Sequence, residues 1–390
     1  MAFSSSSANK NVLRNDHNVA QAGTDGISSL SWSPMSNHLV STNWDGGVRC
    51  WEAQEVGGQI QTMPKLQGAS FLLHCIYTLT TADVLKMFHH SDKSRIFIVQ
   101  SLFSFVVNHE GSAPVLASAF SADGTTIFTG GADKAVRMWQ LGQQPSSPTE
   151  VATQIGVHDS PVKSVAFLPS TNLIVSAGWD KKLKFWDARS PNPAGSLDLP
   201  ERCYDLDVRG NLMVVATAGR HIESYDVQGQ PRKHSSKESP LKFQSRCVRC
   251  FPDNTGFAVG SIEGRVGIHY LQKVQGKESF AFKCHRQNSD VFSVNAIAFH
   301  RNGCFATAGG DGVVNFWDKD NKQRLKNFEP IGRSITCANF NTQGNMFAYG
   351  SSYDWSKGSS FYSPGSPNEI FIHYTTEQEI EPRKKNGVRK

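Results

Sequence analysis

The chain has 390 residues, of which only 19% are charged, and this length fits one large domain or two smaller ones. Its 33 Gly, 24 Phe and 8 Trp exclude a disordered chain and favour a β protein rich in turns and apolar side chains. The net charge of +6 permits an acidic or nucleic-acid partner without requiring one.

No segment predicts secretion or membrane insertion. Residues 1–16 are rich in Ser and Asn and lack the apolar core of a signal peptide, so we expect a disordered N-terminal tail. The longest apolar run, Ile96 to Val107, is too short and too polar to span a bilayer. The eight cysteines form no dense disulfide framework. We therefore expect a soluble intracellular protein in a reducing compartment, without a membrane span.

A short sequence repeat recurs along the chain. Four segments share a hydroxyl residue, an Asp four residues later and a Trp six residues after the Asp. Each follows alternating apolar runs separated by turn residues, which predicts strand, hairpin, strand, turn, strand. This pattern is typical of WD repeats. In chain order the four sets are Ser41/Asp45/Trp51, Thr129/Asp133/Trp139, Ser176/Asp180/Trp186 and Thr307/Asp311/Trp317.

The polar residues of the repeat have a structural explanation. The Asp lies in a tight turn, where a His from the loop before the first strand can hydrogen-bond it. The hydroxyl group and the Trp N–H extend this network, so that every buried polar group has a partner. His109 and His158 occupy that loop position. We interpret the network as structural and not as a catalytic Asp–His pair.

A segment near the second blade interrupts the repeat. Trp51 and Trp139 are 88 residues apart, about one repeat too many, and residues 68–108 lack both the Asp–Trp spacing and a hairpin turn. Two outer strands compete for the second blade, Ile60 to Leu66 and Leu102 to Val107. We expect an irregular insertion into the outer strand or the following loop, and an intron retained in the gene sequence stays open as its origin.

Three further blades are degenerate, which brings the number of blades to seven. They span Leu206 to Asp226, with Tyr225 in the Trp place, Cys247 to Tyr270, with His269 in that place, and Ser334 to Tyr374. Isolated blades would expose sheet edges, so the ring must close. We expect residues 17–376 to form one seven-bladed, all-β WD40 propeller, with the stretch near His17 to Ala22 as the outer strand of the last blade. Residues 377–390 are expected to form a basic tail.

Motifs for catalysis or metal binding are weak. Cys247-Val-Arg-Cys250 is a lone C-x-x-C, and the pair Cys284-His285 is a poor second half for a zinc site. The sequence contains no P-loop, G-x-S-x-G or H-E-x-x-H. We expect no enzyme activity, no cofactor and no metal site.

Two surface motifs leave alternatives open. Trp186-Asp187-Ala188-Arg189 resembles the W-D-x-R sequence by which some WD propellers dock on the adaptor of cullin-four ubiquitin ligases. The basic residues of the C-terminal tail are either solvated or contact RNA phosphates, or serve nuclear targeting. These tail residues are Arg383, Lys384, Lys385, Arg389 and Lys390.

The last third of the chain carries strings that are not part of the generic repeat. KESPLKFQSRCV, GFAVGSIEGRVGIHY, FKCHR, VNAIAFH, FWDKD, FAYGSSYDWSKG and EPRKK resemble the nuclear mRNA-export WD propeller family, a cousin of the mitotic-checkpoint propeller. The resemblance covers the chain except for the first dozen residues and residues 68–108. It implies a non-enzymatic adaptor at the nuclear pore, in the nucleus and partly in the cytoplasm. By kinship it also leaves open a scaffold that binds spindle or checkpoint proteins.

The resemblance further implies partners and partner-binding residues. In the family, a propeller face binds an acidic hairpin segment of a Gly-Leu-Phe-Gly nucleoporin, the GLEBS motif, and basic residues receive a pair of glutamates. By motif position these would be Arg246, Lys319 and Arg324. Arginine–carboxylate contacts that are partly desolvated are strong and orienting. The implied partners are this nucleoporin and mRNA or mRNA–protein particles.

Overall fold

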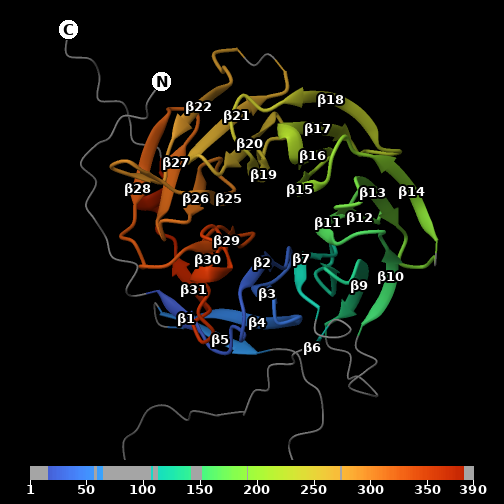
Figure 1. The fold of residues 1–390 in the computed structure, drawn as a ribbon, viewed down its shortest axis with the longest axis horizontal. Coiled ribbons are helices and arrows are strands. Elements are labelled where there is room, and N and C mark those ends of the chain that lie inside the picture. The colour runs from blue at the N-terminus through green and yellow to red at the C-terminus, as the bar shows by residue number, and fades with distance from the viewer. Residues whose placement is uncertain are drawn as a thin grey trace, which may run out of the picture.

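The computed structural model describes residues 16–56, 59–64, 107–108, 113–141, 152–190, 192–272 and 275–381. Seven antiparallel sheets follow one another around a ring (Figure 1). The expected seven-bladed propeller is therefore confirmed. None of the helices in these ranges is long and apolar enough to cross a membrane.

The blades have four strands each, numbered from the channel outward, with two additions. The first blade contains β2 (Ile27–Trp32), β3 (His38–Asn43), β4 (Gly47–Val56), β5 (Gln59–Pro64) and β6 (Val107–Asn108). The second contains β7 (Val115–Phe120), β8 (Thr126–Gly131), β9 (Ala135–Gln140) and β10 (Thr153–Val157). The third contains β11 (Val162–Leu168), β12 (Leu173–Gly178), β13 (Lys182–Trp186) and β14 (Pro193–Asp198).

The remaining blades repeat this order. The fourth contains β15 (Cys203–Arg209), β16 (Leu212–Thr217), β17 (His221–Asp226) and β18 (Arg232–Glu238). The fifth contains β19 (Ser245–Cys250), β20 (Gly256–Ser261), β21 (Arg265–Tyr270) and β22 (Phe280–Lys283), followed by a small hairpin of β23 (Arg286–Gln287) and β24 (Asp290–Val291). The sixth contains β25 (Val294–Phe299), β26 (Phe305–Gly309), β27 (Val314–Asp318) and β28 (Gln323–Asn327). The seventh contains β29 (Ile335–Phe340), β30 (Met346–Ser351), β31 (Glu369–Tyr374) and β1 (His17–Val19). Short helices are η3 (Ala218–Arg220), η4 (Ser359–Phe361) and α2 (Glu377–Ile380).

The apolar core is divided among the junctions between blades. Middle strands such as β16 (LMVVAT) are buried along their whole length, because both faces of each sheet are covered by the neighbouring sheets. The buried hydrophobic side chains form seven clusters, and each cluster joins two adjacent blades. A blade is therefore stable only within the ring, which explains why closure matters.

The N-terminal strand closes the ring. β1 pairs antiparallel with β31, with His17 opposite Ile372, as expected from the sequence. In Figure 1 the first and last strands lie side by side although they are far apart in the sequence. Asp16, which we expected in the N-terminal tail, accepts hydrogen bonds from Tyr349 and His373.

The C-terminal boundary also differs from the expected one. Residues 377–380, assigned above to the basic tail, form α2, which packs on β27 and β28. Ile380 is buried in the cluster between the sixth and seventh blades. A Thr376 capping box starts the helix, in which the Glu379 side chain accepts a hydrogen bond from the Thr376 backbone. The basic residues from position 382 onward lie outside the described residues.

The described parts of the two segments expected to compete both pair in the first blade rather than in the second. β5 pairs with the C-terminal half of β4, with Pro64 opposite Trp51. β6 pairs with the start of the same strand, with Val107 opposite Val48. The second blade instead takes β10 as its outer strand. Most of the segment 68–108 lies outside the described residues.

The registers of β5 and β6 fit one uninterrupted strand. Two residues of β4 lie between Val48, the partner of Val107, and Trp51, the partner of Pro64. Two residues that follow Pro64 would pair with them, so that a third would take the position of Val107. Deleting residues 67–106 joins Leu66 to Val107 in this register. We expect the variant to unfold cooperatively with a Tm within about 3 °C of the full chain, because both halves keep their ladder hydrogen bonds.

A deletion shorter by one residue is the matched control. Removing residues 67–105 shifts Val107 by one position and turns alternate side chains to the wrong face of the sheet. Thermal unfolding followed by circular dichroism compares the two variants. A large loss of Tm in the 67–106 deletion, equal to that of the control, would contradict the continuous-strand interpretation.

Candidate protein-interaction face

Among the described residues, two blades contain the complete hydrogen-bond network of the repeat. In the third blade His158 lies between Asp180, with 2.9 Å from Nδ1 to Oδ2, and Ser176, with 2.7 Å from Nε2 to Oγ. Trp186 Nε1 donates to the same Ser176 Oγ at 2.7 Å. Burial lowers the pKa of His158 although Asp180 opposes this shift, and this direction favours the neutral imidazole.

The sixth blade has the same network with a histidine that the sequence pattern missed. His285 Nδ1 lies 2.8 Å from Asp311 Oδ1, and His285 Nε2 lies 2.9 Å from Thr307 Oγ1. Trp317 Nε1 donates to Thr307 Oγ1 at 2.9 Å. A Cβ on Gly309 would lie 2.4 Å from His285 Nδ1, so glycine is required before this turn. His285 is thus part of the repeat network and does not face a metal site.

The first two blades contain parts of the network. In the second, Trp139 Nε1 donates to Thr129 Oγ1 at 2.9 Å and Arg137 pairs with Asp133, while His109 lies outside the described residues. In the first, Asp45 pairs with Arg49 at 2.9 Å and Ser41 donates to Asn43. Trp51 Nε1 has no hydrogen-bond partner among the described residues.

The C-x-x-C pair cannot form one half of a metal site. Cys247 and Cys250 are three residues apart on β19, which places their side chains on opposite faces of the sheet. Cys247 Sγ approaches Val294 O of the sixth blade, whereas Cys250 Sγ approaches Asp207 O of the fourth. Burial raises the pKa of Cys247 to about 12, so this thiol stays protonated.

The propeller has two chemically different faces. The loops between the second and third strands of each blade, together with the loops that join consecutive blades, form what we call the upper face; the other loops form the lower face. Among the described residues, ten large hydrophobic side chains are exposed, and eight of them lie on the upper face. These eight are Trp44, Val157, Trp179, Phe243, Ile262, Val291, Trp355 and Phe361. Exposed apolar side chains concentrated on one face are typical of an interaction surface.

An aromatic cluster on this face joins the first and seventh blades. Trp355 stacks on Tyr362 with ring centroids 4.9 Å apart, and it contacts Tyr353 at 5.5 Å. Trp44, from the first blade, lies 6.2 Å from Trp355. Trp44 and Trp355 are 40% and 38% exposed, so both present ring surface to a partner.

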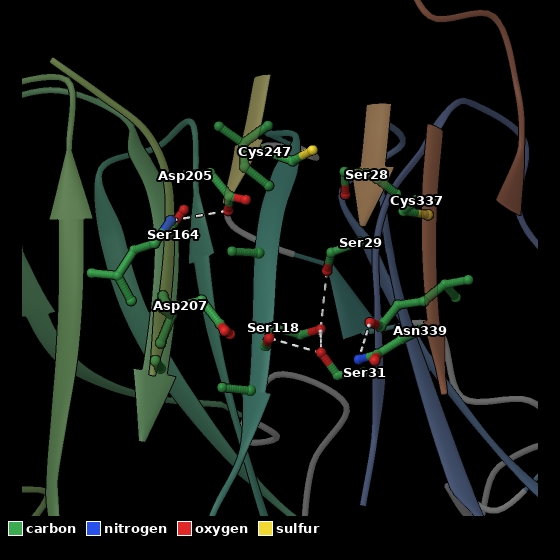
Figure 2. Close-up of a pocket in the computed structure, with 18 of the residues that line it drawn as sticks. Ser28, Ser29, Ser31, Ser118, Ser164, Asp205, Asp207, Cys247, Cys337 and Asn339 are labelled. Carbon is green, nitrogen blue, oxygen red and sulfur yellow. Dashed lines mark hydrogen bonds between the residues drawn. The ribbon is translucent and has the colours of Figure 1, made fainter. Parts of the chain in front are cut away.

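The channel along the ring axis opens beside this cluster. Its volume is about 660 Å³, and Trp44, Arg246 and Trp355 lie at its upper end. Figure 2 shows the serines of β2 and Ser118 on one side and Asp205 and Asp207 on the other. The serine hydroxyls have partners on neighbouring strands, as in the 2.7 Å contact between Ser28 Oγ and Thr42 Oγ1 and the 3.0 Å contact between Ser29 Oγ and Ser118 Oγ.

The channel offers little for catalysis. Asp205 pairs with Arg249 at 2.6 Å, and Asp207 accepts a hydrogen bond from the Cys250 backbone at 2.7 Å. Among the described residues that line it there is no histidine to serve as a base for the serines. Burial raises the pKa of Cys337 to about 12, so its thiol is a poor nucleophile.

The three basic residues implied by the resemblance lie on different faces. Arg246, at the start of β19, is exposed on the upper face, and its Nη2 donates to Asp354 O at 3.4 Å. Lys319 and Arg324 lie on the lower face, Lys319 in the turn between β27 and β28 and Arg324 near the start of β28. The structure therefore does not bring Arg246 together with the other two.

The two lower-face cations have local partners. Lys319 is only 3% exposed, and its Nζ lies 3.0 Å from Asp320 Oδ2 and 5.2 Å from the centre of the Phe251 ring. The Arg324 guanidinium lies 6.0 Å from the centre of the Trp317 ring. Arg246 is the most accessible of the three for an incoming carboxylate.

The W-D-x-R motif lies at the lower end of the third blade. Trp186 is buried in the repeat network, whereas the Arg189 side chain is 80% exposed. Arg189 donates two hydrogen bonds to Asp187, at 2.8 and 2.6 Å, and these lower the pKa of Asp187 to about 2. The pair is solvated and remains accessible to a partner.

Comparison with known proteins defines the class. The family model of the WD domain, G-beta repeat, matches residues 16–52, 100–140, 149–187 and 276–318. The crystal structure of the WD40 β-propeller domain of Doa1 matches with a TM-score of 0.61 over 92% of this chain and 95% of that chain. At 15% identity this likeness shows the fold alone. The protein is a WD-repeat β-propeller.

Closer relatives define the family within this class. The chain is 39% identical to Protein RAE1 of Arabidopsis thaliana, over 98% of this chain and 96% of that protein. It is 40% identical to the mRNA export factor of Xenopus tropicalis, over 99% and 95% of the two chains. It is 37% identical to the Poly(A)+ RNA export protein of Schizosaccharomyces pombe, over 96% and 95%. The chain belongs to the family of WD-repeat mRNA export factors, which confirms the resemblance found in its motifs.

Proposed function

We propose that this protein is a non-enzymatic adaptor that supports mRNA export from the nucleus. It would act at the nuclear pore, where its upper face docks the acidic hairpin segment of a nucleoporin. The names of its relatives support the role in export. The concentration of exposed aromatic and aliphatic side chains on the upper face, with Trp44 and Trp355 beside Arg246 in the channel lining, carries the choice of this face.

The chemistry of this face suits a hairpin with glutamates. Trp44 and Trp355 offer flat apolar surface at the channel mouth, and arginine next to such surface forms strong, oriented bonds with a carboxylate. Within the described part of the chain, the Arg246 side chain makes one hydrogen bond, a long one to a backbone carbonyl, so it can reorient toward a ligand at little cost. Lys319 and Arg324 would be reached by the same partner only across the rim of the ring.

Charge reversal tests this assignment. We expect Arg246→Glu to weaken binding of a GLEBS-type nucleoporin peptide by a factor of about 30 or more, because it replaces an attractive charge by a repulsive one at the contact. Arg324→Glu should weaken binding only if the segment extends to the lower face. The measurement is isothermal titration calorimetry with the purified full chain.

Arg189→Glu is the matched control, because it makes the same change at an exposed arginine on the lower face. Equal affinities of the Arg246→Glu and Arg189→Glu variants would refute docking at Arg246. Purification of the chain from nuclei, with recovery of a pore protein and polyadenylated RNA, tests the wider role and the location.

The exposed Arg189–Asp187 pair supports a second candidate function, as a substrate receptor of a cullin-four ubiquitin ligase. Its accessibility on the lower face would allow adaptor docking there while the upper face remains free. Co-precipitation with the ligase adaptor, lost in Arg189→Ala, would favour this function. If the wild-type chain does not bind the adaptor, this second function is eliminated.

A further inference from the structure

Serines followed by proline recur in this chain, and the structure separates them by exposure. Proline-directed protein kinases require such a pair in an accessible segment. Six of these serines lie among the described residues: Ser33, Ser160, Ser190, Ser239, Ser363 and Ser366. Ser33 and Ser239 are buried and accept hydrogen bonds from the backbone two residues later, at Met35 and Leu241. Their hydroxyl groups therefore serve local turns.

Two of the six serines are exposed enough to be candidate kinase substrates. Ser160 and Ser366 are half-buried, whereas Ser190 and Ser363 are exposed. Ser190 lies on the lower face, in the turn after β13, and Ser363 lies on the upper face, in the loop between β30 and β31. Only Ser363 is thus an exposed Ser-Pro serine on the proposed docking face, within the part of the chain that the structure describes.

The loop that carries Ser363 is held at both ends. On one side Tyr362 stacks on Trp355, and on the other Arg333 Nη1 donates to Pro367 O at 3.1 Å. Between these anchors the backbone of Ser366 donates to Ser363 O at 3.0 Å, which forms a tight turn. The Ser363 hydroxyl is therefore presented on a fixed turn that directly follows the aromatic cluster.

We propose that Ser363 is a phosphorylation site of a proline-directed kinase and that its phosphate releases the acidic partner from the upper face. The Ser363 Oγ would attack the γ-phosphorus of a nucleoside triphosphate bound by the kinase. A new P–O bond forms, the bond to the nucleoside diphosphate breaks, and the hydroxyl proton passes to the kinase base. The regulatory part of this inference rests on the proposed function.

The effect follows from charge. A phosphoserine carries a charge of about −1.5 to −2 at neutral pH. The phosphate would lie next to Tyr362, which stacks on Trp355. Trp355 follows Asp354, and the backbone carbonyl of Asp354 accepts a hydrogen bond from Arg246. A segment that brings glutamates to Arg246 is therefore repelled. We expect about five- to tenfold weaker binding at low salt and a smaller difference at high salt, because ions screen this repulsion.

The test uses the purified full chain and a proline-directed kinase, with phosphosites mapped by mass spectrometry. Among the described Ser-Pro serines, Ser190→Ala leaves Ser363 as the exposed site and Ser363→Ala leaves Ser190, so the two variants form a matched pair. After kinase treatment, peptide affinity should fall in Ser190→Ala and stay unchanged in Ser363→Ala. Stoichiometric phosphate at Ser363 with unchanged affinity, or no phosphate there, would overturn the inference. If the unmodified chain fails to bind the peptide, the proposed function fails, and phosphosite mapping still judges the site itself.

Discussion

Raising the pH from 6.5 to 9.5 should lower the free energy of unfolding of the wild-type protein by about 3 kcal/mol through His373 alone. His373 lies between two carboxylates, with Nδ1 2.8 Å from Asp16 Oδ1 and Nε2 3.0 Å from Glu379 Oε2. Burial lowers its pKa, but the hydrogen bonds and charges of Asp16 and Glu379 prevail and raise the pKa to about 9. The other charged or titratable groups at this site are Lys326, 3.4 Å from Glu379, and Tyr349, which donates to Asp16.

The direction follows from the two states of the chain. An unfolded histidine loses its proton near pH 6.5, whereas the folded His373 keeps it up to about pH 9. The stabilisation is therefore complete below pH 6.5 and is lost as the pH rises through 9. Burial raises the pKa of Glu379, but the hydrogen bond and the charge of His373 prevail and lower it to about 2, so the stabilisation by Glu379 is complete above about pH 4.5 and is lost as the pH falls toward 2.

His373→Gln provides the comparison. The amide can still donate to one carboxylate but carries no charge, so the variant should be less stable at pH 6.5 and nearly equal to the wild type at pH 9.5. Urea unfolding at a series of pH values measures both. A constant difference between the two proteins across this range would show that the charge of His373 does not stabilise the closure of the ring.

Thr307→Val should lower the free energy of unfolding by about 2–4 kcal/mol, because it removes the hydrogen bonds that the Thr307 hydroxyl makes with two buried polar groups. Thr307 is fully buried, and its hydroxyl oxygen accepts a hydrogen bond from Trp317 Nε1 and lies 2.9 Å from His285 Nε2. The substitution keeps the volume and the β-branched shape, so packing changes little. Chemical denaturation of the variant and the wild type measures the difference.

Thr171→Val is the matched control for this substitution. The Thr171 hydroxyl is also buried but has no hydrogen-bond partner among the described residues, so its removal should cost nothing. The chain itself supports the argument: in the fourth and fifth blades, where Tyr225 and His269 replace Trp, the hydroxyl position holds Val215 and Val259. Equal stabilities of the Thr307 and Thr171 variants would contradict the role given to the network.

Local spacing in the sequence predicted the ring well, because each blade repeats the same short pattern. It failed where loop length varies. His285 precedes Trp317 by 32 residues, against 28 for His158 and Trp186, because the hairpin β23–β24 occupies the intervening loop. The fixed spacing therefore misses His285, which the sequence alone presents only as a weak zinc ligand.

Features that depend on closure of the ring had no local signal. Trp44 and Trp355 meet only because the first and seventh blades are neighbours. The partners of His373, Asp16 and Glu379, come from the two end segments for which the sequence predicts tails. Arg246 and Lys319 lie on opposite faces of the propeller because Arg246 is at the start of β19 and Lys319 follows the end of β27. The position of a residue in a motif does not reveal this by itself.

The seventh blade also bears on how the gene could be rearranged. Its outer strand comes from the beginning of the chain and its other strands from the end, so head and tail are anchored beside one another. A circular permutant that links the original ends and starts between β14 and β15 would make the same seven junctions with every blade drawn from consecutive residues. In such a permutant no blade would need strands from both ends of the chain. The division of the seventh blade between the two ends is thus a property of the strand order along the chain and not of the ring.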